Sequence, residues 1–290
     1  MGARFEFSLG TVDSVNRQTK TVTLFDRGKT PVKFEAKASV PWLTVSNGEG
    51  TLEADAERQV VVSVDWSKVP VDEAEGAVTV SSDDARPLTY MLRARKLPIT
   101  RENAQGFVEG DGYVAMEAAD TTSRTAGTMK WVELPGYGAT KSGMTVFPVT
   151  AASEMNSGTS LDYRMYLYDS GDFELQLTLA PTLNFVPGRG LRFAVSVDDG
   201  PRTIVDALEH NSDKDWAQAV SDGVRRVTVP LKIAAPGDHT LKVWAVDPAL
   251  VVERLVVSHG ANGSLKASYL GPPESFHAGV VGAENRSAGQ

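Results

Sequence analysis

Pairs of acidic residues are the first places in this sequence where chemistry could occur. Hydrolysis of a glycosidic bond needs two carboxyl groups held across a cleft. Asp169 with Asp172, Asp198 with Asp199, and Asp247 supply such groups. All of them fall at expected strand ends or tight turns, where aspartate commonly hydrogen-bonds to the backbone. A chain with 37 acidic residues always offers such pairs, so we assign no catalytic residue.

Aromatic residues among polar neighbours point to binding rather than catalysis. Trp131, Tyr137 and Tyr168 lie in such surroundings, and a flat ring exposed to water can stack on a sugar ring. The alternative is that half of these rings belong to a core. Side chains alternate between the faces of a strand, so Tyr163 and Tyr168 cannot share one face. The three rings are therefore candidate carbohydrate-binding residues.

The segment APTLNFVPGRGLRFAVSVDDG, residues 180–200, begins as a loop and becomes a strand. The loop is bounded by proline and glycine and carries Asn184, Phe185 and Arg189. An amide, an aromatic ring and a guanidinium beside a rigid sheet could bind a ligand or complete the active site of another domain. They could also simply turn a corner, with Arg189 bonded to backbone carbonyls. Asn184 and Arg189 join the list of binding candidates.

Composition excludes several classes of function. The absence of cysteine removes disulfides, thiolate nucleophiles and cysteine-based zinc sites. The formal charge of −8, without a basic stripe, argues against nucleic-acid binding. No apolar run reaches the roughly 18 to 20 residues of a membrane helix. The first residues show no signal peptide, as expected of a cytoplasmic protein or of an excised fragment.

The spacing of the strand-like runs predicts an all-β chain of tandem β-sandwiches. We expect an immunoglobulin-like sandwich over 1–97, a linker over 98–110, a jelly-roll sandwich over 111–278 and a flexible tail over 279–290. In the second sandwich, Phe173, Leu175, Leu177 and Leu179 alternate with polar residues, as in a strand with one buried face. One helix interrupts the strands, with a capping box at Ser212 and a stop at Gly223.

Several strings together resemble a known family: DGYVAMEAAD, SGMTVFPV, LDYRMYLYDSGDFELQLTLAPTLNFVPGRGLRFAVSVDDGP, HTLKVWAVDPALVVERLVV and SYLGPPES. The stretch from Gln105 to Ser275 is similar to the C-terminal domain of glycoside hydrolase family 115, whose members are xylan α-1,2-glucuronidases. The N-terminal part looks like the immunoglobulin-like module that precedes this domain. Its strings VPWLTVSNGEGTL and VVVSVDW are also similar to BACON-type domains.

The resemblance implies a non-catalytic accessory region. Family members remove glucuronic acid from xylan by an inverting mechanism, with catalytic parts upstream of this portion, so this chain alone should not be an enzyme. The expected partners are xylan or glucuronoxylan oligosaccharides, the missing catalytic domains and a second copy in a homodimer. Asn184 and Arg189 would then contact the acidic substrate across domains, because an arginine fork meets both carboxylate oxygens at once. The parent enzyme is expected to be secreted or periplasmic.

The second sandwich is also reminiscent of carbohydrate-binding modules of families 6 and 35. No cofactor is required in that relationship, but a structural calcium is expected, with Glu117 and Asp247 as ligands. Two alternatives stay open at this stage. One is a free-standing binding module for acidic plant polysaccharide, and the other is a glycoside hydrolase active on its own.

Overall fold

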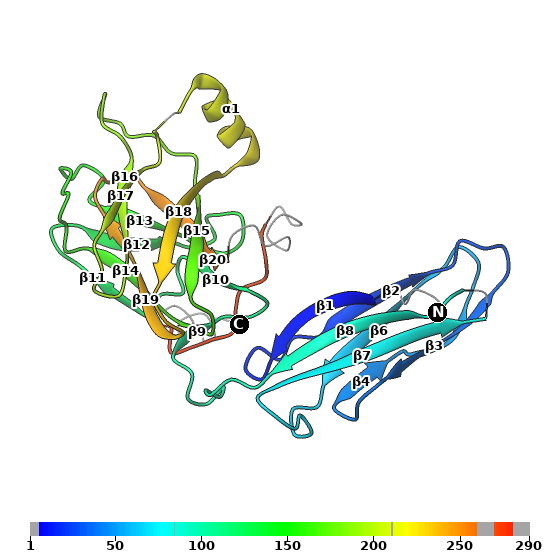
Figure 1. Cartoon of the computed structure of the whole chain (residues 1–290). Coiled ribbons are helices and arrows are strands. Elements are labelled where there is room, and N and C mark those ends of the chain that lie inside the picture. Colours follow the sequence, from blue (N-terminus) through cyan, green and yellow to red (C-terminus); the bar gives the residue numbers. More distant parts are fainter. Residues whose placement is uncertain (1–5, 84, 210, 260–269, 281–290) are drawn as a thin grey trace. The chain divides into compact units, whose positions relative to one another are not determined.

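The computed structural model describes residues 6–83, 85–209, 211–259 and 270–280 (Figure 1). The chain divides into two compact units, Met1–Glu102 and Asn103–Gln290. Apart from one helix, the regular elements of the described residues are strands, so the predicted all-β fold is confirmed. No helix among these residues is both long and apolar enough to cross a membrane.

The first unit is a sandwich of two sheets with an apolar core between them. Val60, Val62 and Val78 are fully buried in this core, and Trp42 packs into it from the turn directly before Leu43. The first strand lies parallel to the last one, whereas the other pairs are antiparallel. One sheet has the order β1 (Glu6–Asp13), β8 (Leu88–Arg95), β7 (Glu73–Ser82), β3 (Val32–Ala38) and β5 (Glu49–Leu52), and the other has the order β2 (Lys20–Phe25), β6 (Glu57–Val64) and β4 (Leu43–Ser46).

The second unit is a larger sandwich of two sheets. The first is ordered β12 (Lys130–Leu134), β13 (Gly143–Phe147), β20 (Val251–Ser258), β15 (Gly171–Leu179) and β18 (Arg225–Ile233), and β10 (Tyr113–Glu117) also pairs with β20. The second is ordered β17 (Thr203–Asp206), β16 (Arg192–Val197), β19 (Gly237–Ala245), β14 (Ser160–Leu167), β9 (Gly106–Val108) and β21 (His277–Ala278), with β11 (Ser123–Thr125) pairing β14.

The alternation read from the sequence sets the core of this unit. Phe173, Leu175, Leu177 and Leu179 on β15 are buried, and their polar neighbours face outward. Tyr163 is fully buried from β14, and its hydroxyl donates a hydrogen bond of 2.7 Å to the Ala118 carbonyl. A buried hydroxyl needs such a partner because leaving it unpaired is costly.

The structure can be compared with the predicted ends of the helix and the predicted bounds of the linker. Helix α1 (Asp213–Asp222) begins with the predicted capping box at Ser212 and ends at Gly223 in the left-handed conformation. The linker predicted over 98–110 extends too far, because residues 106–108 form the buried strand β9 of the second unit. Of the predicted tail, Val280 is buried against the core, and residues 281–290 lie outside the described residues.

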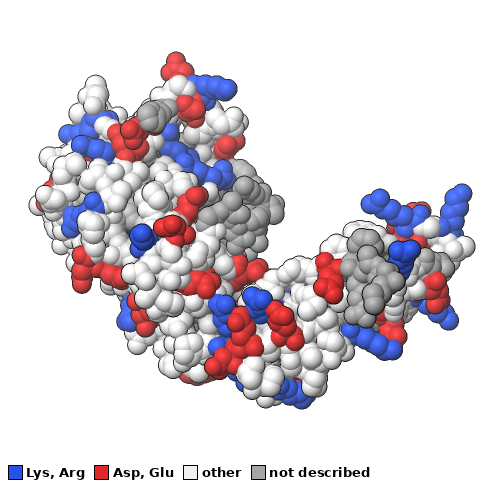
Figure 2. Space-filling model, viewed as in Figure 1, with Lys and Arg blue, Asp and Glu red and all other residues white. Residues whose placement is uncertain are grey.

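The two signs of charge are mixed over both units on the face drawn in Figure 2. Among the coloured residues of that face, the basic side chains form no continuous stripe. This distribution agrees with the argument from the sequence against nucleic-acid binding.

Candidate functional site

The loop between β15 and β16 is held in shape by its own side chains. The Asn184 amide donates to the Gly190 carbonyl at 2.8 Å, and its oxygen accepts from the Val186 backbone at 2.9 Å. Thr182 ties the loop to the segment after β19 through a 2.8 Å bond to the Ala249 carbonyl. Asn184 therefore holds the shape of the loop, because its side chain bonds to backbone atoms of the loop itself.

Arg189 is the cation that this loop presents. Its Nη1 donates one long hydrogen bond of 3.4 Å to the Ala151 carbonyl, and the side chain is half-buried. A guanidinium has five N–H donors, so one long bond leaves most of them available to a ligand. The backbone contact matches the alternative role considered for Arg189, but it does not occupy the fork that recognises a carboxylate.

A second arginine next to this loop is already paired. Arg192, the first residue of β16, meets Asp247 through Nε at 2.8 Å and Nη2 at 3.1 Å. Asp247 is fully buried and also accepts hydrogen bonds from the Arg192 backbone and from Ser153. Burial alone would raise the pKa of Asp247, but the hydrogen bonds from Arg192 and Ser153 outweigh it and lower that pKa below its ordinary value.

The loop that carries Arg189 also carries exposed apolar side chains. Leu183 and Phe185 are 47% and 55% exposed. The segment 147–155 is the neighbour of this loop, because Arg189 bonds to Ala151 and Arg192 reaches the Met155 sulfur at 3.5 Å. We call residues 147–155 and 180–192 together the loop face. An exposed ring beside a cation with free donors can bind a sugar ring that carries a carboxylate.

The three candidate rings do not join this face. Trp131 is 6% exposed and packs in the core, so its prediction as a sugar-stacking ring is wrong. Tyr137 is 46% exposed, but it lies at the β12–β13 turn, at the opposite end of β13 from Phe147. Tyr168 lies between the end of β14 and the start of β15, whereas the two segments of the loop face precede the start of β14 and follow the end of β15. The length of the sandwich therefore separates both tyrosines from Arg189.

Sequence reasoning missed one aromatic site. Trp244 on β19 is half-buried on the outer side of its sheet, with Arg202 3.5 Å from the centroid of its ring. Its Nε1 donates to Ser196 at 3.0 Å, and Lys242 lies 5.8 Å from the ring. The signal was present, because the predicted alternation of Leu241, Val243 and Ala245 places Trp244 on the other face.

Comparison with known proteins fits this architecture. Residues 106–274, more than half of the chain, match the model of the glycosyl hydrolase family 115 C-terminal domain. The chain belongs to this family. No curated protein matches the chain. The matched part of the family is its C-terminal domain, and no catalytic domain is identified in the chain.

Solved structures similar to this family 115 chain show low identity. BtGH115A, a family GH115 4-O-methyl-α-glucuronidase with specificity for decorated arabinogalactans, shares 13% identity over 57% of this chain and 19% of its own, with a TM-score of 0.41. A family 35 carbohydrate-binding module from Clostridium thermocellum shares 14% identity over 50% and 98%, with a TM-score of 0.36. SSP-19, an MSP-domain-like protein of Caenorhabditis elegans, shares 16% identity over 30% and 92%, with a TM-score of 0.24. This chain thus spans about a fifth of the length of BtGH115A.

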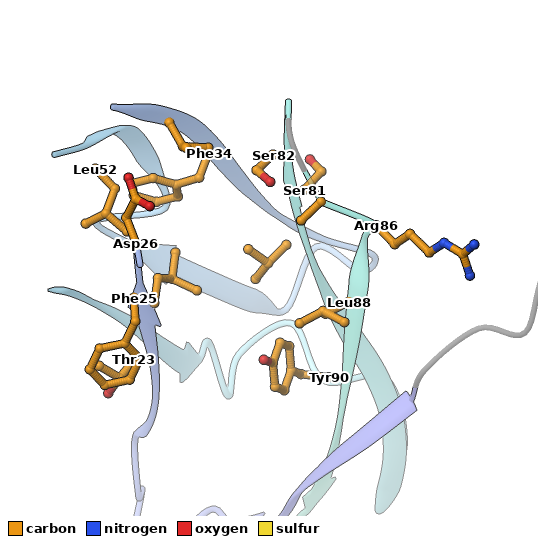
Figure 3. Close-up of a pocket in the computed structure, with 14 residues that line it drawn as sticks. Thr23, Phe25, Asp26, Phe34, Leu52, Ser81, Ser82, Arg86, Leu88 and Tyr90 are labelled. Carbon is orange, nitrogen blue, oxygen red and sulfur yellow. The ribbon is translucent and has the colours of Figure 1, made fainter. Parts of the chain in front are cut away.

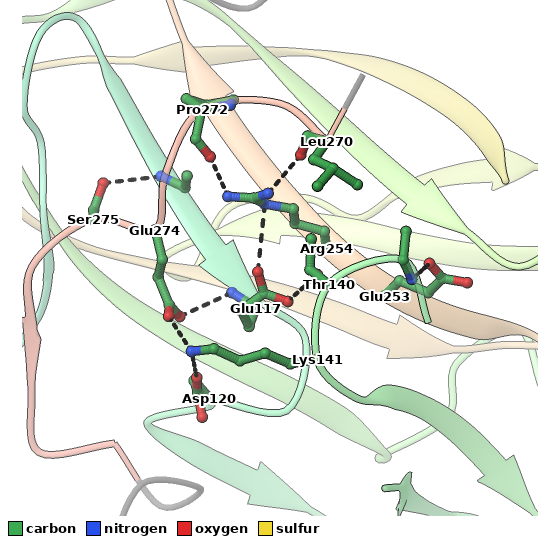
Figure 4. A network of polar contacts seen from close by, with 12 residues as sticks. Glu117, Asp120, Thr140, Lys141, Glu253, Arg254, Leu270, Pro272, Glu274 and Ser275 are labelled. Atoms are coloured by element: carbon green, nitrogen blue, oxygen red, sulfur yellow. Dashed lines mark hydrogen bonds and ion pairs between the residues drawn. The ribbon is translucent and has the colours of Figure 1, made fainter. Parts of the chain in front are cut away.

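The two residues predicted to bind calcium in this family 115 domain, Glu117 and Asp247, each contact an arginine. Glu117, on β10, accepts a 2.6 Å hydrogen bond from Thr140 and lies 3.7 Å from Arg254 Nε (Figure 4). Burial raises the pKa of Glu117, against the opposing effects of Thr140 and Arg254. Asp247 is paired with Arg192 instead. The structure therefore places an arginine beside each carboxylate where sequence reasoning placed a shared calcium ion.

The same network fastens the segment that leads into β21. Lys141 lies 2.5 Å from Glu274 and 3.4 Å from Asp120 (Figure 4). Arg254 donates hydrogen bonds to the carbonyls of Leu270 and Pro272. Although partial burial opposes it, pairing with Glu274 and Asp120 raises the pKa of Lys141. Asp120, Glu274 and His277 have ligand atoms within 4.8 Å of one another, as have Glu109, Asp169 and His259. At the first group an ammonium already supplies the positive charge.

Three of the aspartates considered as catalytic pairs, Asp172, Asp198 and Asp199, lie at the surface or bond to the nearby backbone. Asp198 accepts a 2.8 Å hydrogen bond from the Thr240 backbone and another of 2.8 Å from His239. Asp199 and Asp172 are exposed, at a turn and on an outward position of β15. Asp198 and Asp199 are thus turn residues, whereas Asp172 lies on the outer face of a strand.

Proposed function

We propose that the chain is a non-catalytic accessory region of a xylan α-1,2-glucuronidase and that its loop face binds uronic-acid groups of glucuronoxylan. The observation that carries the proposal is Arg189, a half-buried guanidinium with one long hydrogen bond. It projects from a loop that the hydrogen bonds of Asn184 hold in shape and that also carries the exposed Phe185 ring. A preorganised donor loses little entropy when a ligand binds.

The chemistry of the face favours an acidic sugar over a neutral one. A planar guanidinium binds a carboxylate through two parallel hydrogen bonds, which a hydroxyl group cannot accept as strongly. Leu183 and Phe185 supply apolar surface for the faces of the sugar rings. The net charge of −8 opposes a general attraction to polyuronates, so recognition depends on this local arrangement.

The proposal extends to the parent protein. Family membership supports catalytic domains elsewhere in a longer polypeptide, a secreted or periplasmic location where plant polysaccharide is met, and assembly as a homodimer. In that setting the loop face serves either to hold the polysaccharide or to reach the substrate of a neighbouring catalytic domain.

Affinity electrophoresis of the whole chain tests the binding role. We expect gels that contain glucuronoxylan to retard the chain more than gels with neutral xylan. Arg189→Ala should remove most of that difference. Arg164→Ala is the matched control, because Arg164 is an exposed arginine of β14 outside the loop face. Equal retardation by both polysaccharides, or an unaltered Arg189→Ala variant, would contradict the proposal.

A further inference from the structure

The first unit contains a cavity between its two sheets. Its volume is about 330 Å³, and residues of β2, β3, β7 and β8 line it (Figure 3). Phe34, Leu52 and Val80 form a buried apolar floor, and Leu88 and Tyr90 form a half-buried wall. An engineered apolar cavity of about 150 Å³ binds benzene, so this cavity is large enough for a small organic molecule.

A carboxylate with an unsatisfied oxygen lines this apolar cavity. Asp26, directly after the last residue of β2, is only 8% exposed. Its Oδ1 accepts a 2.6 Å hydrogen bond from the Gly28 backbone, whereas its Oδ2 is buried and has no hydrogen-bond partner. Buried polar atoms nearly always have a partner, since an unpaired one costs free energy. A hydrogen-bond donor that enters the cavity would therefore find an acceptor there after a small turn of the Asp26 side chain.

Phe25 and Tyr90 also line the cavity. Phe25 is 61% exposed on β2, and Phe7 is 47% exposed and stacks on Tyr90 at 5.5 Å between ring centroids. A contiguous exposed apolar patch, unlike single exposed side chains, often marks a binding site. The faces of aromatic rings attract cations, and aromatic pockets recognise organic ammonium groups in this way.

We propose that this cavity binds a small organic molecule that carries a primary ammonium group on an aromatic or short alkyl body. The ammonium would donate to Asp26, the neighbouring ring faces would stabilise its charge, and the apolar floor would take the body. Arg86 does not supply the missing partner, because its side chain points away from Asp26 in Figure 3. The site does not depend on the function proposed for the second unit, since all its residues belong to the first.

A sugar does not fit this site. Its hydroxyl groups need a hydrogen-bond partner each when they are buried, and most of the side chains that line the cavity are apolar. An apolar molecule without a donor would bury its surface but leave Asp26 Oδ2 unpaired. The ammonium is therefore the group that the cavity selects.

Binding of phenethylammonium to the whole chain tests the proposal, with 2-phenylethanol and phenylacetate as neutral and anionic probes of similar shape. Two-dimensional NMR titration locates each probe and measures its dissociation constant. We expect phenethylammonium to shift amides of β2, β7 and β8 and to bind at least tenfold more tightly than 2-phenylethanol. Phenylacetate should bind weakest of the three.

Two variants and one control assign the interaction. Asp26→Asn should weaken phenethylammonium about tenfold and abolish its advantage over 2-phenylethanol. Leu88→Trp, which fills the cavity from its half-buried wall, should weaken both probes. Asp55→Asn removes the same charge at an exposed position and should change neither. Asparagine suits the positive φ of 59° at Asp55, so the control should fold normally.

Two results would overturn the proposal. The first is equal binding of the three probes. The second is shifts confined to the second unit.

Discussion

The Arg192–Asp247 pair gives the sharpest test of how the loop face is held. Arg192→Met keeps much of the side-chain volume but removes the Nε and Nη2 bonds of 2.8 and 3.1 Å. Asp247 then stays fully buried as an anion, with only the Arg192 backbone and Ser153 as donors. Removing one partner of a buried pair costs about 3–5 kcal/mol.

The expected cost lies at the lower end of this range. The Arg192 side chain is 30% exposed, so water already screens part of the attraction. We therefore expect Arg192→Met to lower the free energy of unfolding of the second unit by about 3 kcal/mol. Adding Asp247→Asn should recover about half of this loss, because a neutral amide can remain buried with its hydrogen bonds. Lys232→Met, at an exposed position of β18, is the control and should change stability by less than about 0.5 kcal/mol.

The pH dependence of the effect has a definite sign. In the wild type the pKa of Asp247 is lowered by folding, so its stabilising contribution is present above the unfolded pKa and is lost as the pH falls through the folded pKa. Without Arg192, burial raises the folded pKa of Asp247 instead. The destabilisation by Arg192→Met should then be largest near pH 7 and should shrink as acid protonates the carboxyl.

Hydrogen-exchange mass spectrometry of the whole chain at increasing urea concentrations measures the free energy of unfolding of each unit separately. Peptides of β16 and β19 report on the second unit, and peptides of β7 and β8 on the first. A loss below about 1 kcal/mol at pH 7, or one that stays constant down to pH 3.5, would refute the reasoning, because the pair would then be screened like a surface ion pair.

Three further substitutions test contacts of the loop between β15 and β16, of the core and of the segment that leads into β21. Gly190→Ala would place a methyl group 1.9 Å from Asp206 Oδ2, so we expect a loss of about 1–3 kcal/mol by urea unfolding, whereas Gly158→Ala has open space and should be neutral. Tyr163→Phe leaves the Ala118 carbonyl without its donor and should cost about 1–3 kcal/mol in the same assay, and a change below 0.5 kcal/mol would show that water replaces the hydroxyl. Lys141→Met should speed limited proteolysis within residues 270–278 by removing the contacts to Glu274 and Asp120, whereas unaltered cleavage would show that the remaining contacts, among them those of Arg254 and Ser275, hold this segment without Lys141.

Local patterns predicted the features that depend on neighbouring residues. Alternation identified the buried face of β15, and parity separated buried Tyr163 from half-buried Tyr168. The capping box of α1 was visible because its two partners are three residues apart. Each of these features is decided within one strand or one helical turn.

Features that join distant segments were beyond such patterns. Arg192 and Asp247 are 55 residues apart, and neither position shows its partner in the sequence. Trp131 has polar neighbours along the chain, yet its pairing opposite buried Val146 puts it inside. The predicted role of Asn184 and Arg189 rested on residue type, and the structure adds the internal bonds of the loop.

The parallel pairing of β1 with β8 has a mechanical consequence for the first unit. The chain enters at Glu6, opposite Thr89, and leaves after Arg95, opposite Asp13, so entry and exit lie at opposite ends of one ladder. A pulling force between these two points would act along the strands and load the hydrogen bonds of the ladder together rather than one at a time. Bonds loaded in shear must break together, so this unit should resist stretching much better than a hairpin opened from its free end.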